Sequence, residues 1–234
     1  MMPEPDLPLA LAGALPPALC AKLGQAAQAL QLPAGHPDLQ PTSGSVRLRA
    51  LGPALVAGTL QSLWQGPAGD ALRERLGPLP LCLESQCWLR RQFPAGLRPP
   101  GQHPHQWHQD GALGCRFDAA AAPETLAPLL TVWVPLVDCG EDAPSLEWLT
   151  EVPHELVPPA GLHDAALPAV PGARRHARLA AGQALLFGPA LLHRTHVTPT
   201  MTRPRVSVEL RFVTPGTLPV RLADESCRPM PPGG

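Results

Sequence analysis

The segment Trp107-His108-Gln109-Asp110-Gly111 places an imidazole and a carboxylate two positions apart, in a run whose composition predicts an extended backbone. On a β-strand, residues i and i+2 point to the same face of the sheet. His108 and Asp110 could therefore hold one cation between them. A His-x-Asp triplet also arises by chance, and both side chains would then face water or hydrogen-bond a neighbouring turn.

A second histidine, brought in by folding, would complete the arrangement of two histidines and one carboxylate that binds non-haem Fe(II) and leaves coordination positions open. His193 is a candidate because it ends the apolar run at 185–192. A side chain at the edge of a packed core is held rigidly, as a metal ligand must be. The alternatives are a hydrogen-bonded core histidine at 193, His196 as the ligand instead, or a different metal site built from His103, His105 and His108.

Residues 205–212 alternate strictly between polar and apolar side chains, which is typical of a β-strand with two different faces. This polar face could point to solvent. Arg205 and Ser207 could instead bind a carboxylate, because the guanidinium supplies two parallel N–H donors and the hydroxyl supplies a third. The polar face consists of Arg205, Ser207, Glu209 and Arg211.

The bulk composition excludes several classes of protein. Of the 234 residues, 44% are hydrophobic and 16% are charged, and the net charge is −1. This balance gives no general attraction to nucleic acid or to an anionic membrane. No apolar run reaches the length of about 18 residues that a transmembrane helix needs. The six scattered cysteines contain no Cys-x-x-Cys pair, which indicates free thiols and a reducing, cytoplasmic setting.

The hydrophobic pattern divides the chain into a helical and a β part. Helices are expected over about 17–31 and within 52–76, with a break near Gly66-Pro67. One domain over 1–223 is expected, with a helical part at 1–78, a β core at 79–213 and a flexible tail at 224–234. The expected strands are 81–90, 105–110, 129–138, 145–152, 174–180, 183–188, 191–197 and 205–213.

Together these motifs resemble the Fe(II)/2-oxoglutarate-dependent oxygenases, and among them the phytanoyl-CoA dioxygenase family. The matching segments are Trp-His-Gln-Asp-Gly at 107–111, Val-Trp-Val-Pro-Leu at 132–136 and Leu-Leu-Phe-Gly-Pro-Ala-Leu-Leu-His at 185–193. The resemblance covers residues 80–213. It implies a mainly β fold, a double-stranded β-helix (cupin-like jelly roll) with N-terminal helices. A segment that the family has after the tryptophan strand is degenerate here, reading Val-Pro-His-Glu at 152–155.

The resemblance also implies roles for individual residues. His108, Asp110 and His193 would bind Fe(II). Arg205, assisted by Ser207, would bind the distal carboxylate of the cosubstrate 2-oxoglutarate. The hydroxyl of Thr131 would also contact the cosubstrate.

The activity implied is dioxygenase chemistry. It would use O2, release succinate and CO2, and hydroxylate a C–H bond of a natural-product or amino-acid-like small molecule. Related halogenases lack the carboxylate ligand, so Asp110 favours hydroxylation, desaturation or ring closure.

Two other functions are compatible with the sequence. One is a jelly-roll module that binds a ligand or a metal without catalysis. The other is a cupin-type metalloenzyme that uses no 2-oxoglutarate. Arginines outside the motifs are interpreted as solvated surface. They are Arg90, Arg91, Arg98, Arg174, Arg175 and Arg178.

Overall fold

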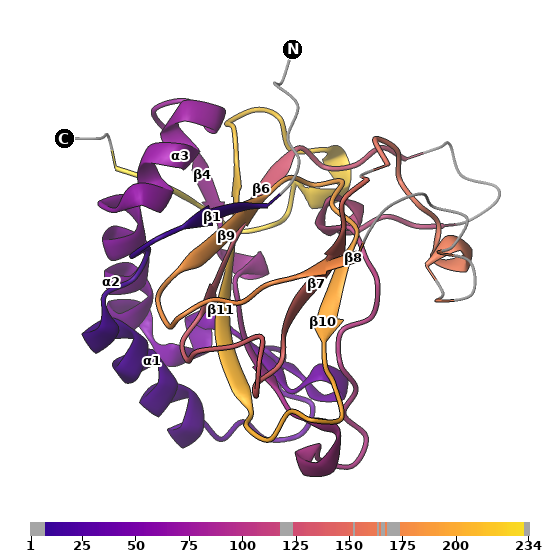
Figure 1. Cartoon of the computed structure of the whole chain (residues 1–234). Helices are drawn as coiled ribbons and strands as arrows, with labels where there is room; N and C mark the ends of the chain where they lie inside the picture. The colour runs from indigo at the N-terminus through magenta and orange to yellow at the C-terminus, as the bar shows by residue number, and fades with distance from the viewer. Residues whose placement is uncertain are drawn as a thin grey trace.

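Two antiparallel sheets face each other, and helices cover the outer side of the larger one (Figure 1). The computed structural model describes residues 8–117, 124–151, 153–162, 164, 167 and 174–231. This arrangement is the mainly β jelly roll with flanking helices that the resemblance implies. Among the described residues, no helix is long and apolar enough to cross a membrane.

The helices follow the expected pattern. They are α1 (Pro17–Ala29), α2 (Pro53–Trp64) and α3 (Pro67–Leu76). Each begins with a proline, whose fixed φ suits the first helical position and whose missing N–H would have no partner there. The break at Gly66-Pro67 separates α2 from α3, as predicted.

The larger sheet contains strands from almost the whole chain. Among the described residues its main order is β1 (Leu9–Leu11), β9 (Ala184–Phe187), β6 (Leu129–Pro135), β11 (Arg205–Val213), β5 (Trp88–Gln92), β3 (Ser45–Arg47) and β2 (Leu39–Gln40). Off this path, β4 (Leu81–Leu83) pairs with β11 and with β12 (Cys227–Pro229). The smaller sheet has the order β10 (His193–His196), β7 (Ser145–Leu149) and β8 (Arg174–His176). The N-terminal part thus contributes short strands as well as helices.

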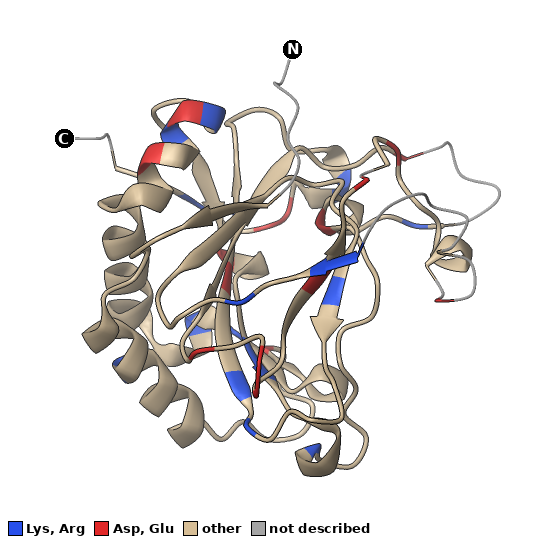
Figure 2. Ribbon diagram, viewed as in Figure 1, with Lys and Arg blue, Asp and Glu red and all other residues tan. Residues whose placement is uncertain are grey.

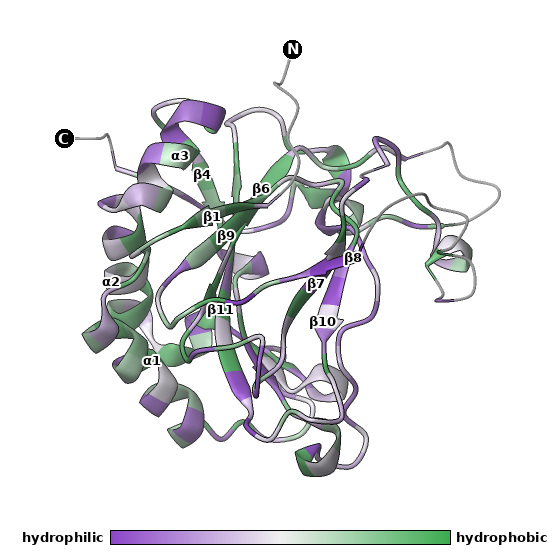
Figure 3. Ribbon diagram, in the orientation of Figure 1, coloured by the Kyte–Doolittle hydropathy of each residue, from purple (hydrophilic) through white to green (hydrophobic). Residues whose placement is uncertain are grey.

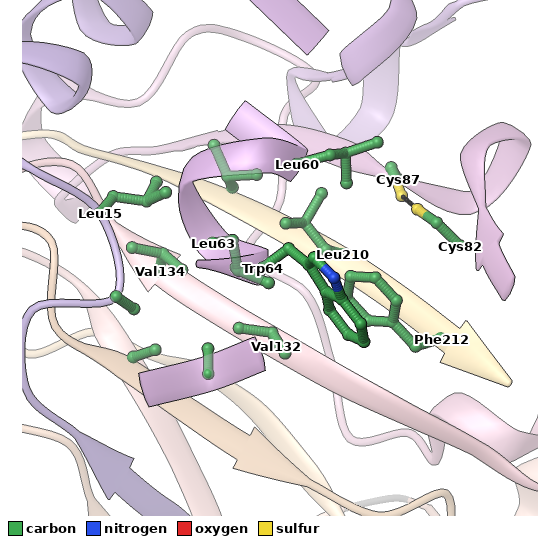
Figure 4. Close-up of a cluster of buried hydrophobic side chains, with 14 of the residues drawn as sticks. Leu15, Leu60, Leu63, Trp64, Cys82, Cys87, Val132, Val134, Leu210 and Phe212 are labelled. Carbon is green, nitrogen blue, oxygen red and sulfur yellow. Dashed lines mark hydrogen bonds between the residues drawn. The ribbon is translucent and has the colours of Figure 1, made fainter. Parts of the chain in front are cut away.

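Hydrophobic cores lie on both sides of the larger sheet. On the outer side, Leu63 and Trp64 of α2 pack with Val132, Leu210 and Phe212 (Figure 4). On the inner side, Trp133 of β6 and Phe187 of β9 pack with Leu146 of β7. All seven residues of β6 are buried, and Figure 3 shows this central strand as largely hydrophobic.

Strand β11, next to β6 in the larger sheet, has one face toward each of these two cores. All nine of its residues are buried, so the solvent-facing interpretation of its polar face is wrong. The apolar face packs against the helices. The polar face therefore lines the space between the sheets, and Figure 2 shows a basic position on the lower part of β11.

Three expectations about local structure require correction. The run 81–90 is two strands, because a 3-10 turn at Glu84–Gln86 divides it. Residues 105–110 form no regular strand; only His108 makes a β-bridge. The tail expected to be flexible from 224 is anchored, since β12 pairs with β4 and the carboxylate of Glu225 accepts a 2.7 Å hydrogen bond from Gln86. Residues 232–234 lie outside the described residues.

Candidate metal centre

The backbone brings two distant histidines together. The amide of His108 donates to the carbonyl of His193 at 3.0 Å, and the amide of His193 donates to the carbonyl of His108 at 3.1 Å. The two imidazole rings consequently lie side by side, with their centroids 4.2 Å apart. This isolated antiparallel bridge joins the 107–111 segment to the edge strand β10.

Both imidazoles present the same nitrogen to the site. Nδ1 of His108 lies 2.7 Å from the carbonyl oxygen of Gln106, and Nδ1 of His193 lies 3.0 Å from that of Leu191. A carbonyl only accepts hydrogen bonds, so Nδ1 carries the proton in each ring. The unprotonated Nε2 atoms remain free to bind a cation.

Asp110 reaches the same point from a turn. It begins a 3-10 turn at Asp110–Ala112, and its Oδ1 lies 3.7 Å from Nε2 of His108. The next residue must be glycine, because a Cβ at Gly111 would lie 2.7 Å from Cβ of Pro189. One ligand atom each from His108, Asp110 and His193 lies within 4.8 Å of the others. A bridge followed by a turn, and not two positions on one strand face, produces this convergence.

The rest of the motif fixes the loop. Buried Gln109 donates to the carbonyls of Glu155 and Ala190 at 3.0 Å and accepts from the amide of Val157 at 2.8 Å. Trp107 is buried in a small apolar cluster and donates to Asp164 at 3.1 Å. These contacts hold the metal-ligand candidates on a rigid support.

Two side chains hold the carboxylate of Asp110. Thr131 donates to Oδ2 at 2.6 Å, and Arg211 donates to Oδ1 at 2.6 Å. Burial opposes ionisation, but the Arg211 guanidinium and the two nearby imidazoles hold the pKa of Asp110 well below its usual range. The carboxylate is therefore anionic at neutral pH. The resemblance implies that the Thr131 hydroxyl contacts the cosubstrate. In the structure this hydroxyl donates to Asp110.

The other candidate histidines lie outside this cluster. The ring of His196 stacks on that of His176, with centroids 4.5 Å apart and planes 10° apart. Nε2 of His105 lies 2.7 Å from Nη1 of Arg90, and His103 is not part of the group of ligand atoms. Among the described residues, the cluster that could hold a metal consists of His108, Asp110 and His193.

A group of unpartnered donors lies further along the inner face of β11. Nε and Nη1 of Arg205 and the hydroxyl of Ser207 are buried and have no hydrogen-bond partner among the described residues. The guanidinium lies 5.0 Å from the ring of Trp133, whose Nε1 is also buried and unpartnered. Burial lowers the pKa of Arg205 to about 10, which leaves it charged at neutral pH. Unpaired buried donors are costly, and their grouping indicates a binding site for an anion.

The sequence interpretation missed three interior charges. Arg90 is only 6% exposed, so its assignment to the solvated surface is wrong. Its guanidinium binds Glu209 through two hydrogen bonds of 2.5 and 2.9 Å, and Glu209 also accepts from Arg211. The alternation of polar and apolar residues over 205–212 indicates that two of these charges, Glu209 and Arg211, are interior. They share a strand face with Arg205, so an inward Arg205 requires both of them to point inward. Arg91, Arg174, Arg175 and Arg178 are exposed, as expected.

The half-buried His108 predicts an acid-sensitive fold. Burial, with His193 close by, lowers the pKa of His108 from 6.5 to about 4. Between these values the unfolded chain binds a proton that the folded chain does not. The unfolding free energy of the metal-free protein should therefore decrease by about 3 kcal/mol as the pH falls through this window.

Urea unfolding at pH 7 and pH 4.5 measures this effect. The variant His108→Gln should lose part of the pH dependence in this range, and the remainder should come from His105, whose pKa burial also lowers. A variant with the same dependence as the parent protein would show that His108 is not responsible.

Comparison with known proteins shows the fold but no sequence relative. No protein-family model and no curated protein sequence matches the chain. The non-heme α-ketoglutarate-dependent epimerase SnoN from nogalamycin biosynthesis is 20% identical, with a TM-score of 0.61 over 97% of this chain and 89% of that chain. EctD from S. alaskensis, with bound Fe, is 18% identical, with a TM-score of 0.66 over 92% and 75%. The non-heme monooxygenase ThoJ is 20% identical, with a TM-score of 0.60 over 98% and 81%. This chain therefore has the jelly-roll fold of these non-heme enzymes.

Proposed function

We propose that this protein is an Fe(II)- and 2-oxoglutarate-dependent dioxygenase that oxidises a C–H bond of a small molecule. The observation that supports this most strongly is a combination of two features in one interior. A His-Asp-His cluster suited to Fe(II) lies between the sheets, and a buried guanidinium with no partner in the described part of the chain lies further along β11.

The donor set fits a non-haem iron ion. His108 and His193 offer neutral nitrogens, and Asp110 offers one anionic oxygen. Three protein ligands of this kind leave positions open for a chelating cosubstrate and O2. The metal and cosubstrate would supply the oxidative chemistry, with release of succinate and CO2, while the protein binds and orients the reactants.

The unpartnered donors fit the cosubstrate. 2-Oxoglutarate has two carboxylates, and we propose that one binds the metal while the distal one binds Arg205. Trp133 lies 5.0 Å from this guanidinium, and Ser207 is two residues from Arg205 on the same face of β11, so both could donate to the same group. The carboxylate would satisfy donors that are otherwise buried and unpaired. The related fold of SnoN has been crystallised with Fe3+ and α-ketoglutarate, which supports this assignment.

Turnover of the cosubstrate tests the proposal. Protein supplied with Fe(II), 2-oxoglutarate and air should release succinate without an added substrate, in a slow uncoupled reaction followed by mass spectrometry. Asp110→Ala should lose this activity, because it removes the one anionic ligand. The control Asp142→Ala removes only an exposed ion pair with Arg203 and should retain it. The absence of succinate, or equal succinate without Fe(II), would favour a binding module.

A further inference from the structure

Asp110 is held by two strands at once. Arg211 on β11 and Thr131 on β6 are direct partners in the antiparallel register, so their side chains are neighbours on one face. Each donates to a different oxygen of the same carboxylate, at 2.6 Å. The sheet therefore sets both the position and the tilt of Asp110, although Asp110 itself lies in a turn.

Arg211 is fixed in turn by a second layer of contacts. Its guanidinium donates to the carbonyl of Gln86 at 2.9 Å and to the carboxylate of Glu209. Arg90, on the adjacent strand β5, binds the same carboxylate through two further hydrogen bonds. The side chains of Arg90, Glu209 and Arg211 are each at most 8% exposed. They form a buried line of alternating charge that ends at Asp110.

Two physical effects of Arg211 on a bound cation oppose each other. Its positive charge repels a cation and withdraws electron density from Asp110, which weakens binding. Its rigid hydrogen bond holds the carboxylate in the orientation for binding, which strengthens it. Four hydrogen bonds join Arg90, Glu209, Arg211 and Asp110 in sequence, which is more than charge neutralisation of Asp110 alone requires.

We propose that Arg211 and Thr131 are positioning residues that hold Asp110 for metal binding, and that Glu209 and Arg90 hold Arg211. Glu209, although it is an interior carboxylate, supports the site and does not ligate the metal. This inference rests on the metal site of the proposed function but not on the cosubstrate. It is therefore tested with the metal alone.

Titration with Co2+, an air-stable substitute for Fe(II), separates the charge repulsion by Arg211 from its orientation of Asp110. Removal of the repulsion would raise the affinity for Co2+, and loss of the orientation would lower it. Arg211→Met should bind Co2+ about 10- to 100-fold more weakly than the parent protein. Arg211→Lys should recover only part of this loss, because an ammonium cannot reproduce the fork of donors. The control Arg203→Met, which removes an exposed pair with Asp142, should bind normally. Unchanged or tighter binding in Arg211→Met, or full recovery in Arg211→Lys, would overturn the proposal.

A second variant tests the proposal if Arg211→Met fails to fold. Thr131→Val keeps the volume and removes only the hydroxyl that donates to Oδ2. It should weaken Co2+ binding by about tenfold and change the visible ligand-field spectrum of the bound ion. The control Thr59→Val removes a buried hydroxyl that donates to Leu55 within α2. If both variants bind Co2+ alike, the positioning role is wrong. If the parent protein does not bind Co2+ at all, the proposed function itself fails.

Discussion

Replacement of His193 by alanine should abolish Fe(II) binding and 2-oxoglutarate-dependent succinate formation. The imidazole is 2% exposed and presents Nε2 to the site, because a carbonyl fixes Nδ1. Its loss leaves His108 and Asp110 as two of the three candidate ligands. Metal content after anaerobic reconstitution and the rate of succinate formation both measure this effect.

His196→Ala is the matched control for that variant. His196 lies on the same strand three residues away, and its ring stacks on His176 outside the metal cluster. It should retain both metal and activity. The opposite result, with His193→Ala active and His196→Ala inactive, would transfer the ligand role to His196.

Replacement of Arg205 by methionine should weaken 2-oxoglutarate binding severely. Loss of one partner from a buried charged pair costs about 2–5 kcal/mol, which corresponds to roughly 30-fold to a few thousand-fold in affinity. The KM for 2-oxoglutarate should rise by this factor, while Fe(II) binding should persist because Arg205 is not a metal-ligand candidate. Initial rates over a range of 2-oxoglutarate concentrations measure the change.

The neighbouring arginine provides the control. Arg203 is two residues away in sequence, but it is exposed and paired with Asp142. Arg203→Met should leave the KM unchanged. If Arg205→Met also leaves it unchanged, the distal carboxylate binds elsewhere in the interior.

Local sequence patterns predicted the parts of the fold that depend on near neighbours. Helical periodicity predicted the helices over about 17–31 and within 52–76 with their break near Gly66-Pro67, and strict alternation identified β11. The same alternation gave two faces but not their directions, because that depends on which face the helices cover. Arg90 was misassigned for a related reason. Its partner Glu209 lies 119 residues away, so no local pattern could show that the charge is buried and paired.

The candidate site was predicted in its residues but not in its geometry. The sequence identified His108, Asp110 and His193, and the structure brings their ligand atoms together. The bridge between His108 and His193 and the turn at Asp110 are long-range or irregular features, which a strand pattern does not encode. The hydrogen bond from Thr131 to Asp110 likewise depends on how two strands pair with a distant turn.

Anaerobic titration with Fe(II) followed by 2-oxoglutarate tests the central claim most directly, since it requires both the metal and the chelating cosubstrate to occupy one site. A charge-transfer absorption band should develop in the visible spectrum of the parent protein and saturate at one 2-oxoglutarate per chain. His193→Ala should give no band, and Arg205→Met should give it only at much higher 2-oxoglutarate concentrations. Absence of the band in the parent protein, or an identical titration in Arg205→Met, would contradict the account.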